Sequence, residues 1–277
     1  MKEFNNRKIA KKYAEYITGK ELRQYAAEKI KKYVPNLKSI FDGAAGSGQL
    51  EEYVKPEKFV AVEIQKSAAD VLKENYINSR VYNKSFFQFD EDVICDAVLM
   101  NPPFSMKLKE QDEEDIKAIQ KEFPWKKSGV VDDIFLLKSL NFTKRYGFYI
   151  MFPGITYRRA ELKMRELIGN SLLELNTIEN AFEDTSISVI FIVIDKEKNT
   201  NTYHSELYDC KTKTIKAEQE ITLEKDLNTW ERATFIEEKE KIDIVKLEAE
   251  IKRLHERNIA RMNELDRFIE EELKGFR

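Results

Sequence analysis

Short apolar runs alternate with amphipathic segments through the middle of the chain, residues 39–196. We expect the runs to form strands, namely Ser39–Phe41, Phe59–Val62, Val81–Tyr82, Ala97–Met100, Phe148–Phe152, Leu173–Ile178 and Val189–Ile194. Between most of them, apolar residues recur at helical spacing, notably over Ala68–Asn75, Ile134–Arg145 and Arg159–Leu167. This alternation predicts an α/β fold with a mainly parallel sheet and helices on both faces.

Other patterns flank this core. Residues 1–38 are expected to form an N-terminal helical segment, broken at Thr18-Gly19, with Ile9 and Tyr13 on the apolar stripe of its first half. Residues 197–229 are polar and rich in Thr and Lys, which indicates a small hairpin region. Residues 230–277 predict a long coiled-coil-like helix. Its apolar stripe has a spacing of three and four: Ile244, Leu247, Ile251, Leu254, Leu265 and Phe268.

Composition adds a charge asymmetry to this picture. Residues 1–38 carry eleven Lys or Arg and four Glu, a net +7, so the total of −3 leaves −10 on the remainder. A basic face of this kind suits a phosphate backbone, although a solvated helix would look the same. The two cysteines are far apart and in no metal-binding spacing, which argues against a disulfide scaffold or metal site. The charged first 30 residues and short apolar runs indicate no signal peptide or membrane span, so we expect a cytoplasmic protein.

A glycine-rich turn follows the first predicted strand, in the sequence SIFDGAAGSGQL of residues 39–50. Gly43, Gly46 and Gly48 have the spacing GxxGxG, whereas a dinucleotide site needs GxGxxG and a P-loop needs a following Gly-Lys-Ser/Thr. Asp42 would repel a pyrophosphate but suits the ammonium and sulfonium of S-adenosylmethionine. A turn of this kind can also serve only to pack a strand against a helix.

A second acid strengthens the cofactor interpretation. Glu63 ends the next apolar run, fifteen residues after Gly48. A carboxylate at the tip of the second strand can accept hydrogen bonds from both hydroxyls of a ribose. The turn and the acid together predict a nucleoside-containing cofactor.

The most specific motif is Asn101-Pro102-Pro103-Phe104, directly after an apolar strand. Two prolines fix the backbone and remove two N–H donors, so carbonyl oxygens remain as acceptors. The side-chain oxygen of Asn101 and the carbonyl of Pro102 can therefore accept the two hydrogens of an amino group. The ring of Phe104 offers a surface on which a planar base can stack.

This ordered set resembles the amino-methyltransferase superfamily, and more narrowly the adenine-specific DNA methyltransferases related to the modification subunit of type I restriction–modification systems. Three later segments, DIFLLKSL (133–140), GFYIMFPG (147–154) and FEDTSISVIFIVIDK (182–196), follow that family's order of helix, strand and final strand pair. The segment GKELRQYAA (19–27) is similar to its N-terminal cofactor-side segment, so the likeness covers residues 18–196.

The resemblance implies a Rossmann-like class I fold with a mostly parallel seven-stranded sheet, S-adenosylmethionine as cofactor and DNA as substrate. It implies that Asn101, Pro102, Pro103 and Phe104 are catalytic. The implied cofactor-binding residues are Thr18, Lys20, Asp42, Gly43, Ala44, Gly46, Gly48, Glu63, Ile64, Ser85, Phe86 and Asn101. Direct transfer of the sulfonium methyl to the adenine amino nitrogen needs no metal, and a duplex must present the base flipped out.

The chain departs from the family at three places. Lys84-Ser85-Phe86 stands where the family has an acid before Phe, and the N-terminal segment lacks Phe-Thr-Pro. A target-recognition domain is also missing. We therefore expect the C-terminal helix to pair with a second copy or with a separate specificity subunit, or else to fold back on its own domain. The charged segment Met106–Ser128 is expected to be a mobile loop over the target nucleotide or a solvated excursion.

Three rival functions stay open at this point. An RNA adenine methyltransferase would use the same tetrapeptide. A protein glutamine methyltransferase has a related turn that usually ends in Tyr, so Phe104 counts against it. A catalytically silent assembly subunit would retain the fold, but the intact motif with Asp42 and Glu63 argues against such a relic.

Overall fold

The computed structural model describes residues 18–182, 187–223, 229–234 and 244–274. The first half of the predicted N-terminal helix, with Ile9 and Tyr13, lies outside the described residues. The second half forms α2 (Lys20–Tyr33). The chain is organised as two compact units, residues 1–235 and 236–277.

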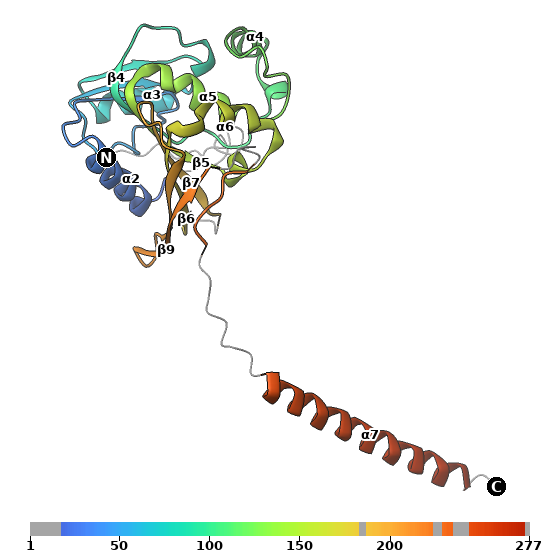
Figure 1. The fold of residues 1–277 in the computed structure, drawn as a ribbon. Coiled ribbons are helices and arrows are strands. Elements are labelled where there is room, and N and C mark those ends of the chain that lie inside the picture. Colours follow the sequence, from blue (N-terminus) through green and yellow to red (C-terminus); the bar gives the residue numbers. More distant parts are fainter. Residues whose placement is uncertain (1–17, 183–186, 224–228, 235–243, 275–277) are drawn as a thin grey trace. The chain divides into compact units, whose positions relative to one another are not determined.

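The first unit is built on one sheet with the strand order β3-β2-β1-β4-β5-β7-β6-β8-β9 (Figure 1). The strands are β1 (Ser39–Asp42), β2 (Lys58–Val62), β3 (Ser79–Tyr82), β4 (Cys95–Met100), β5 (Thr143–Met151), β6 (Leu172–Glu179), β7 (Val189–Asp195), β8 (Thr202–Asp209) and β9 (Thr214–Thr222). All seven predicted strands are therefore confirmed.

The predicted seven-stranded, mostly parallel sheet is corrected to a mixed sheet of nine strands. The first five strands pair in parallel, whereas β7 runs antiparallel to both β5 and β6. The polar region after residue 196 supplies β8 and β9, and β8 joins the same sheet by parallel pairing with β6. β9 is the last strand of the sheet, and most of its side chains are exposed. Its polar residues, which alternate with apolar ones, suit this edge position.

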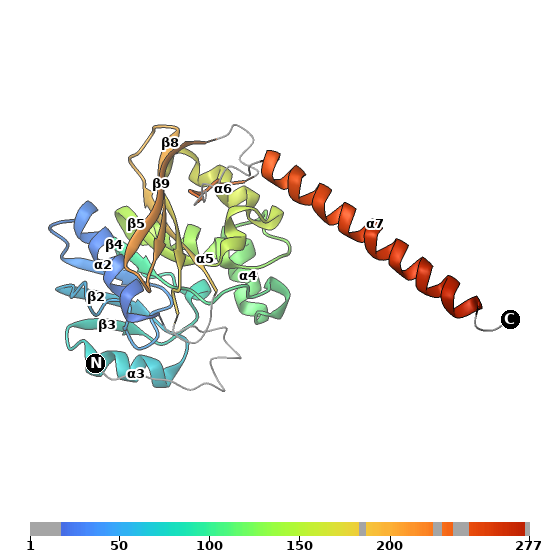
Figure 2. The same cartoon turned by 90° about the horizontal axis from the view of Figure 1, so that it is seen from below.

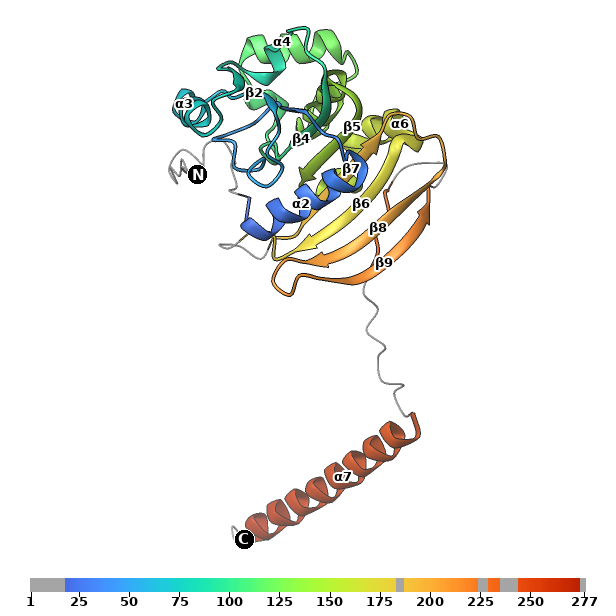
Figure 3. The same ribbon diagram turned by 90° about the vertical axis from the view of Figure 1, so that its left-hand side faces the viewer.

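Helices cover both faces of the sheet, as predicted (Figures 2 and 3). Alternate residues of the central strands point to opposite faces, so Val98 and Met100 pack in one core cluster and Ala97 and Leu99 in the other. The remaining helices of the first unit are α3 (Lys66–Asn75), α4 (Glu113–Glu122), α5 (Asp132–Ser139) and α6 (Leu162–Ile168). The short 3-10 helices are η1 (Phe86–Gln88), η2 (Leu108–Glu110), η3 (Leu140–Phe142), η4 (Pro153–Thr156), η5 (Arg159–Glu161) and η6 (Gly169–Ser171).

The helix predicted over Ile134–Arg145 extends six residues too far, because α5 ends at Ser139 and, after η3, β5 already begins at Thr143. Thr143 pairs with Cys95 of β4, and the guanidinium of Arg145 donates to both carboxylate oxygens of Asp195 at 2.7 Å. Pairing with two neighbouring strands thus overrides the local helical spacing.

The segment Met106–Ser128 packs onto the core through part of its length. It contains η2 and α4, and Leu108 and Ile119 are buried in the core cluster that also holds α5. A backbone bridge between Lys107 and Val130 closes its base. We call residues 106–131 the excursion below.

The second unit contains α7 (Ile244–Lys274). Three residues of its predicted stripe are more than half exposed, namely Ile251, Leu254 and Leu265. Among the described residues, no helix has the length and apolar character that crossing a membrane requires.

Candidate active site

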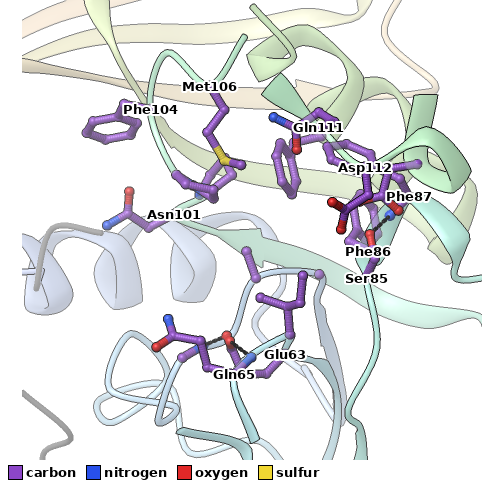
Figure 4. A pocket seen from close by; sticks show the side chains of 18 of the residues that line it. Glu63, Gln65, Ser85, Phe86, Phe87, Asn101, Phe104, Met106, Gln111 and Asp112 are labelled. Atoms are coloured by element: carbon purple, nitrogen blue, oxygen red, sulfur yellow. Dashed lines mark hydrogen bonds between the residues drawn. The ribbon is translucent and has the colours of Figure 1, made fainter. Parts of the chain in front are cut away.

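A cavity of about 290 Å³ lies at the carboxyl ends of β1, β2 and β4 (Figure 4). Strands that run in parallel present these ends at one edge of the sheet, where α/β folds bind their ligands. Eleven of the predicted site residues line it: Gly43, Ala44, Gly46, Glu63, Ile64, Ser85, Phe86, Asn101, Pro102, Pro103 and Phe104. Four do not, namely Thr18, Lys20, Asp42 and Gly48.

The glycine loop requires glycine at two positions. A Cβ on Gly43 would lie 2.6 Å from ring carbons of Phe86, so a side chain there would push Phe86 out of the cavity wall. Gly48 has φ +77°, and an added Cβ would also lie 2.6 Å from the ring of Tyr76. The loop is therefore shaped by contacts with the segments that follow β3 and α3 as well as by its own turn.

Glu63 is placed by the backbone at the tip of β2. One carboxylate oxygen accepts a hydrogen bond from the Gly46 N–H at 2.8 Å, and the other from the Gln65 N–H at 2.6 Å. The amide of Asn83 holds the same tip by donating to the carbonyls of Glu63 and Ile64. A carboxylate fixed in this way at the cavity wall can accept further hydrogen bonds, because each oxygen has two lone pairs.

Asp42 belongs to a buried acid pair behind the loop. One of its oxygens accepts from the Ala44 N–H at 2.7 Å, and Glu51, which is completely buried, shares a hydrogen bond with it. Burial raises the pKa of Asp42 to about 7, and burial together with the charge of Asp42 raises the pKa of Glu51 well above its usual range. Glu51 is thus a second buried acid behind the loop, and the sequence patterns did not single it out.

The amide of Asn101 is oriented by the N-terminal segment. Its nitrogen donates to the hydroxyl of Thr18 at 2.8 Å, across 83 positions of sequence. Its oxygen lies on the side of Phe104 (Figure 4). Thr18 therefore touches the side chain of Asn101 and does not line the cavity, whereas Lys20 is exposed at the start of α2.

The chain just after Phe104 is held in place by the polar contacts of Ser105. Ser105 has φ +58° and donates its N–H to Asp132 at 2.9 Å, while its hydroxyl accepts from Arg158 at 3.1 Å. The guanidinium of Arg158 lies 4.9 Å from the ring centre of Phe152, which in turn lies 6.3 Å from that of Phe104. These contacts hold the turn from α5 and from the segment after β5.

Part of the cavity wall was not predicted. Phe135 stacks on Phe86 with centres 5.5 Å apart and planes 7° apart. The other additional residues are Gln65, Phe87, Met106, Glu110, Gln111, Asp112 and Asp115. Five of these belong to the excursion. The only sequence signal for a role of this segment was its position directly after the tetrapeptide. Ser85 accepts a hydrogen bond from the Phe87 N–H at 3.3 Å.

Comparison with protein families gives one match. The model described as "N-6 DNA Methylase" matches residues 61–272, which is more than half of the chain and includes the tetrapeptide and most of α7. Comparison with the curated proteins found no match.

Solved structures share the fold at low sequence identity. A type I restriction–modification methyltransferase subunit from Streptococcus thermophilus has a TM-score of 0.60 at 18% identity and covers 79% of this chain and 53% of its own. A structure concerned with complex assembly and conformational transition of the type I system has a TM-score of 0.63 at 13% identity. The match covers 93% of this chain and 66% of that one. A Listeria monocytogenes protein assigned to the class I S-adenosylmethionine-dependent methyltransferases has 0.56 at 13%, covering 70% and 65%. The chain thus spans about half the length of the first of these proteins.

Proposed function

This chain belongs to the N-6 DNA methylase family, and we propose on that basis that it transfers the methyl group of S-adenosylmethionine to the exocyclic amino group of adenine in DNA. The observation that carries the proposal is the wall formed by Asn101, Pro102, Pro103 and Phe104 in the same cavity as Glu63. The residues that we assign to the cofactor and those that we assign to the amino group therefore line the same cavity.

The cavity wall fits the chemistry of S-adenosylmethionine. Glu63 offers acceptors for the ribose hydroxyls, and the apolar side chains of Ile64 and Phe86 flank a place for a planar base. The missing side chain of Gly43 leaves space that a Cβ could not share with Phe86. When bound, the cofactor supplies an electrophilic methyl group on a sulfonium.

The role that we assign to the turn is to hold and activate the amino group. The Asn101 oxygen and the Pro102 carbonyl accept its two hydrogens, which favours a more tetrahedral and more nucleophilic nitrogen. Thr18 keeps the amide nitrogen of Asn101 occupied, so the oxygen is the atom presented to the amino group. Phe104 stacks on the adenine, which a duplex presents only after flipping it out.

The test is methyl transfer from labelled S-adenosylmethionine onto duplex DNA, single-stranded DNA and structured RNA, followed by nucleoside analysis. We expect label in N6-methyladenine of DNA. Label found in RNA alone would show that the substrate is RNA and not DNA. S-adenosylmethionine binding without transfer to any nucleic acid or to glutamine peptides would indicate a silent assembly subunit.

We also propose that the second unit binds another protein chain. The apolar residues of α7 need a covering surface, since a bare apolar stripe of this length favours aggregation, and a partner helix would supply that surface. A second copy or a specificity subunit would suit it, and the type I assembly named above is consistent with the latter. Light scattering of the full chain and of a form ending at residue 235 tests this. A monomeric full chain that methylates DNA unaided would contradict it.

A further inference from the structure

A second cavity of about 350 Å³ is lined by the later part of the excursion, and no step of the proposed reaction uses it. Its wall combines Trp125, Lys127 and Ser128 of the excursion with Arg159 of η5 and Lys163 of α6. The two groups of residues meet at Gly129, where an added Cβ would lie 2.8 Å from the Cβ of Ala160.

The charges of this wall do not cancel. Lys126 is buried against Asp133 at 2.6 Å, and Lys163 pairs with Glu166 at 2.9 Å. Within the described part of the chain, Lys127 and Arg159 form no ion pair and both are exposed. The cavity therefore keeps two surplus positive charges beside the half-buried indole of Trp125.

Two sets of contacts place this wall next to the catalytic turn. Gly129 accepts a hydrogen bond from Leu108, and Val131 donates to Met106, a residue of the first cavity. Arg158, the neighbour of Arg159, donates to Ser105, which directly follows Phe104. The wall of the second cavity is thus connected to the turn assigned to the target base by direct contacts: Arg158, next to Arg159, contacts Ser105, next to Phe104.

We propose that the second cavity binds phosphodiester groups of the DNA strand that presents the target adenine. A flipped base leaves its own backbone at the cavity mouth, so the neighbouring phosphates must pass the residues that follow Phe104. Lys127 and Arg159 neutralise them, and Trp125 offers a ring to an adjacent unpaired base or sugar. The inference rests on the proposed function, since it concerns the same substrate.

Trp125 provides a reporter, because the chain has two tryptophans and the other, Trp230, is only 1% exposed. Iodide should quench Trp125 efficiently because of the nearby cations, and a duplex oligonucleotide should protect it. Trp125→Phe should abolish the protected signal. Inorganic phosphate that protects as well as the duplex at equal phosphate concentration would overturn the proposal, because the cavity would then bind any free anion.

The decisive comparison is Lys127→Ala/Arg159→Ala against Lys58→Ala/Lys73→Ala, which removes two exposed charges from the amino end of β2 and from α3. The first variant should weaken binding of duplexes equally for all sequences and make the slope of log affinity against log salt shallower by about 2. The control should change neither, and both should bind S-adenosylmethionine like the wild type.

The two proposals fail in different ways. Wild-type protein that transfers no methyl group to DNA contradicts the proposed function. Wild-type protein that methylates DNA while Lys127→Ala/Arg159→Ala has unchanged affinity and salt dependence overturns the second cavity alone. Wild-type protein that binds no duplex overturns the inference as well. An acidic peptide that displaces the duplex from this cavity at equal charge concentration would likewise reject a site specific to nucleic acid.

Discussion

The two halves of the main cavity hold their polar groups in different ways. In the half to which we assign the cofactor (the cofactor half, residues 42–48, 63–65 and 85–87), carboxylates and hydroxyls accept hydrogen bonds from nearby backbone N–H groups, as Glu63 does from Gly46 and Gln65. In the half to which we assign the target base (the target half, residues 101–105), the groups are held by side chains from distant parts of the chain, as Asn101 is by Thr18 and Ser105 by Asp132 and Arg158.

This difference has a consequence for function. The bonds in the first half are accepted from backbone N–H groups of the loop after β1 and of the tip of β2, so their geometry follows from the paths of these neighbouring parallel strands. The target half is fixed only when α2, α5 and the segment after β5 are all in place. We therefore expect substitutions in the first half to change cofactor affinity, and substitutions in the second to change the rate of transfer.

The largest effect is expected for Asn101→Ala. It removes an acceptor that acts on the transferring nitrogen, so kcat should fall by about 10³-fold while cofactor affinity stays constant. The matched control is Asn83→Ala, which removes the amide that holds the Glu63 tip and should weaken cofactor binding without a comparable loss of kcat. Single-turnover kinetics and calorimetric titration give the two quantities. Equal loss of affinity in both variants would end the distinction between the halves.

Glu63→Ala should weaken S-adenosylmethionine binding by about 1–3 kcal/mol, because hydrogen bonds to a charged group are lost. At saturating cofactor the rate should recover to near the wild-type value. Asp42→Asn should cost less, since Asp42 does not line the cavity and its amide oxygen could still accept from Ala44. A larger loss of affinity for Asp42→Asn than for Glu63→Ala would contradict the proposal that the cofactor contacts Glu63 and not Asp42.

Thr18→Val keeps the shape of the side chain but removes the hydroxyl that accepts from Asn101. We expect kcat to fall about tenfold, which corresponds to roughly one lost hydrogen bond, with unchanged cofactor affinity. In the Thr18→Val/Asn101→Ala double variant, the threonine change should have no further effect on kcat. Additive losses would show that Thr18 acts through something other than Asn101.

The last effect concerns the pH dependence of stability and leaves binding and the rate of transfer aside. The pKa of Asp42 is raised by burial to about 7, so the folded state binds more protons than the unfolded state between pH 3.8 and about 7. Its contribution to stability is therefore fully present below pH 3.8 and is lost as pH rises through about 7. Glu51→Gln can still donate to Asp42 and leaves only one titrating acid. Thermal unfolding between pH 3.8 and about 7 should show that the stability of this variant depends less on pH than that of the wild type. Parallel curves for the two proteins would show that the acid pair does not cause the pH dependence.

Much of the fold could be read from the sequence because local patterns and tertiary structure agree there. Seven apolar runs of strand length became strands, and the glycine turn, Glu63 and the tetrapeptide lie at neighbouring strand ends because parallel strands present those ends together. Periodicity alone did not reveal that β8 and β9 extend the same sheet, since strand pairing partners are not written in a single segment.

The sequence by itself determined which chemical groups this protein brings to its site: a glycine turn, an acid at each of two strand ends and the Asn101 to Phe104 turn. Only the tertiary structure decided which acid faces the cavity and which is buried against Glu51. It also decided that Thr18 orients Asn101 and that the excursion contributes residues to two cavities. The physical reason is that these contacts join separate elements of the fold, such as Asn101 with Thr18 across 83 positions and Ser105 with Asp132 across 27, and no local pattern records them.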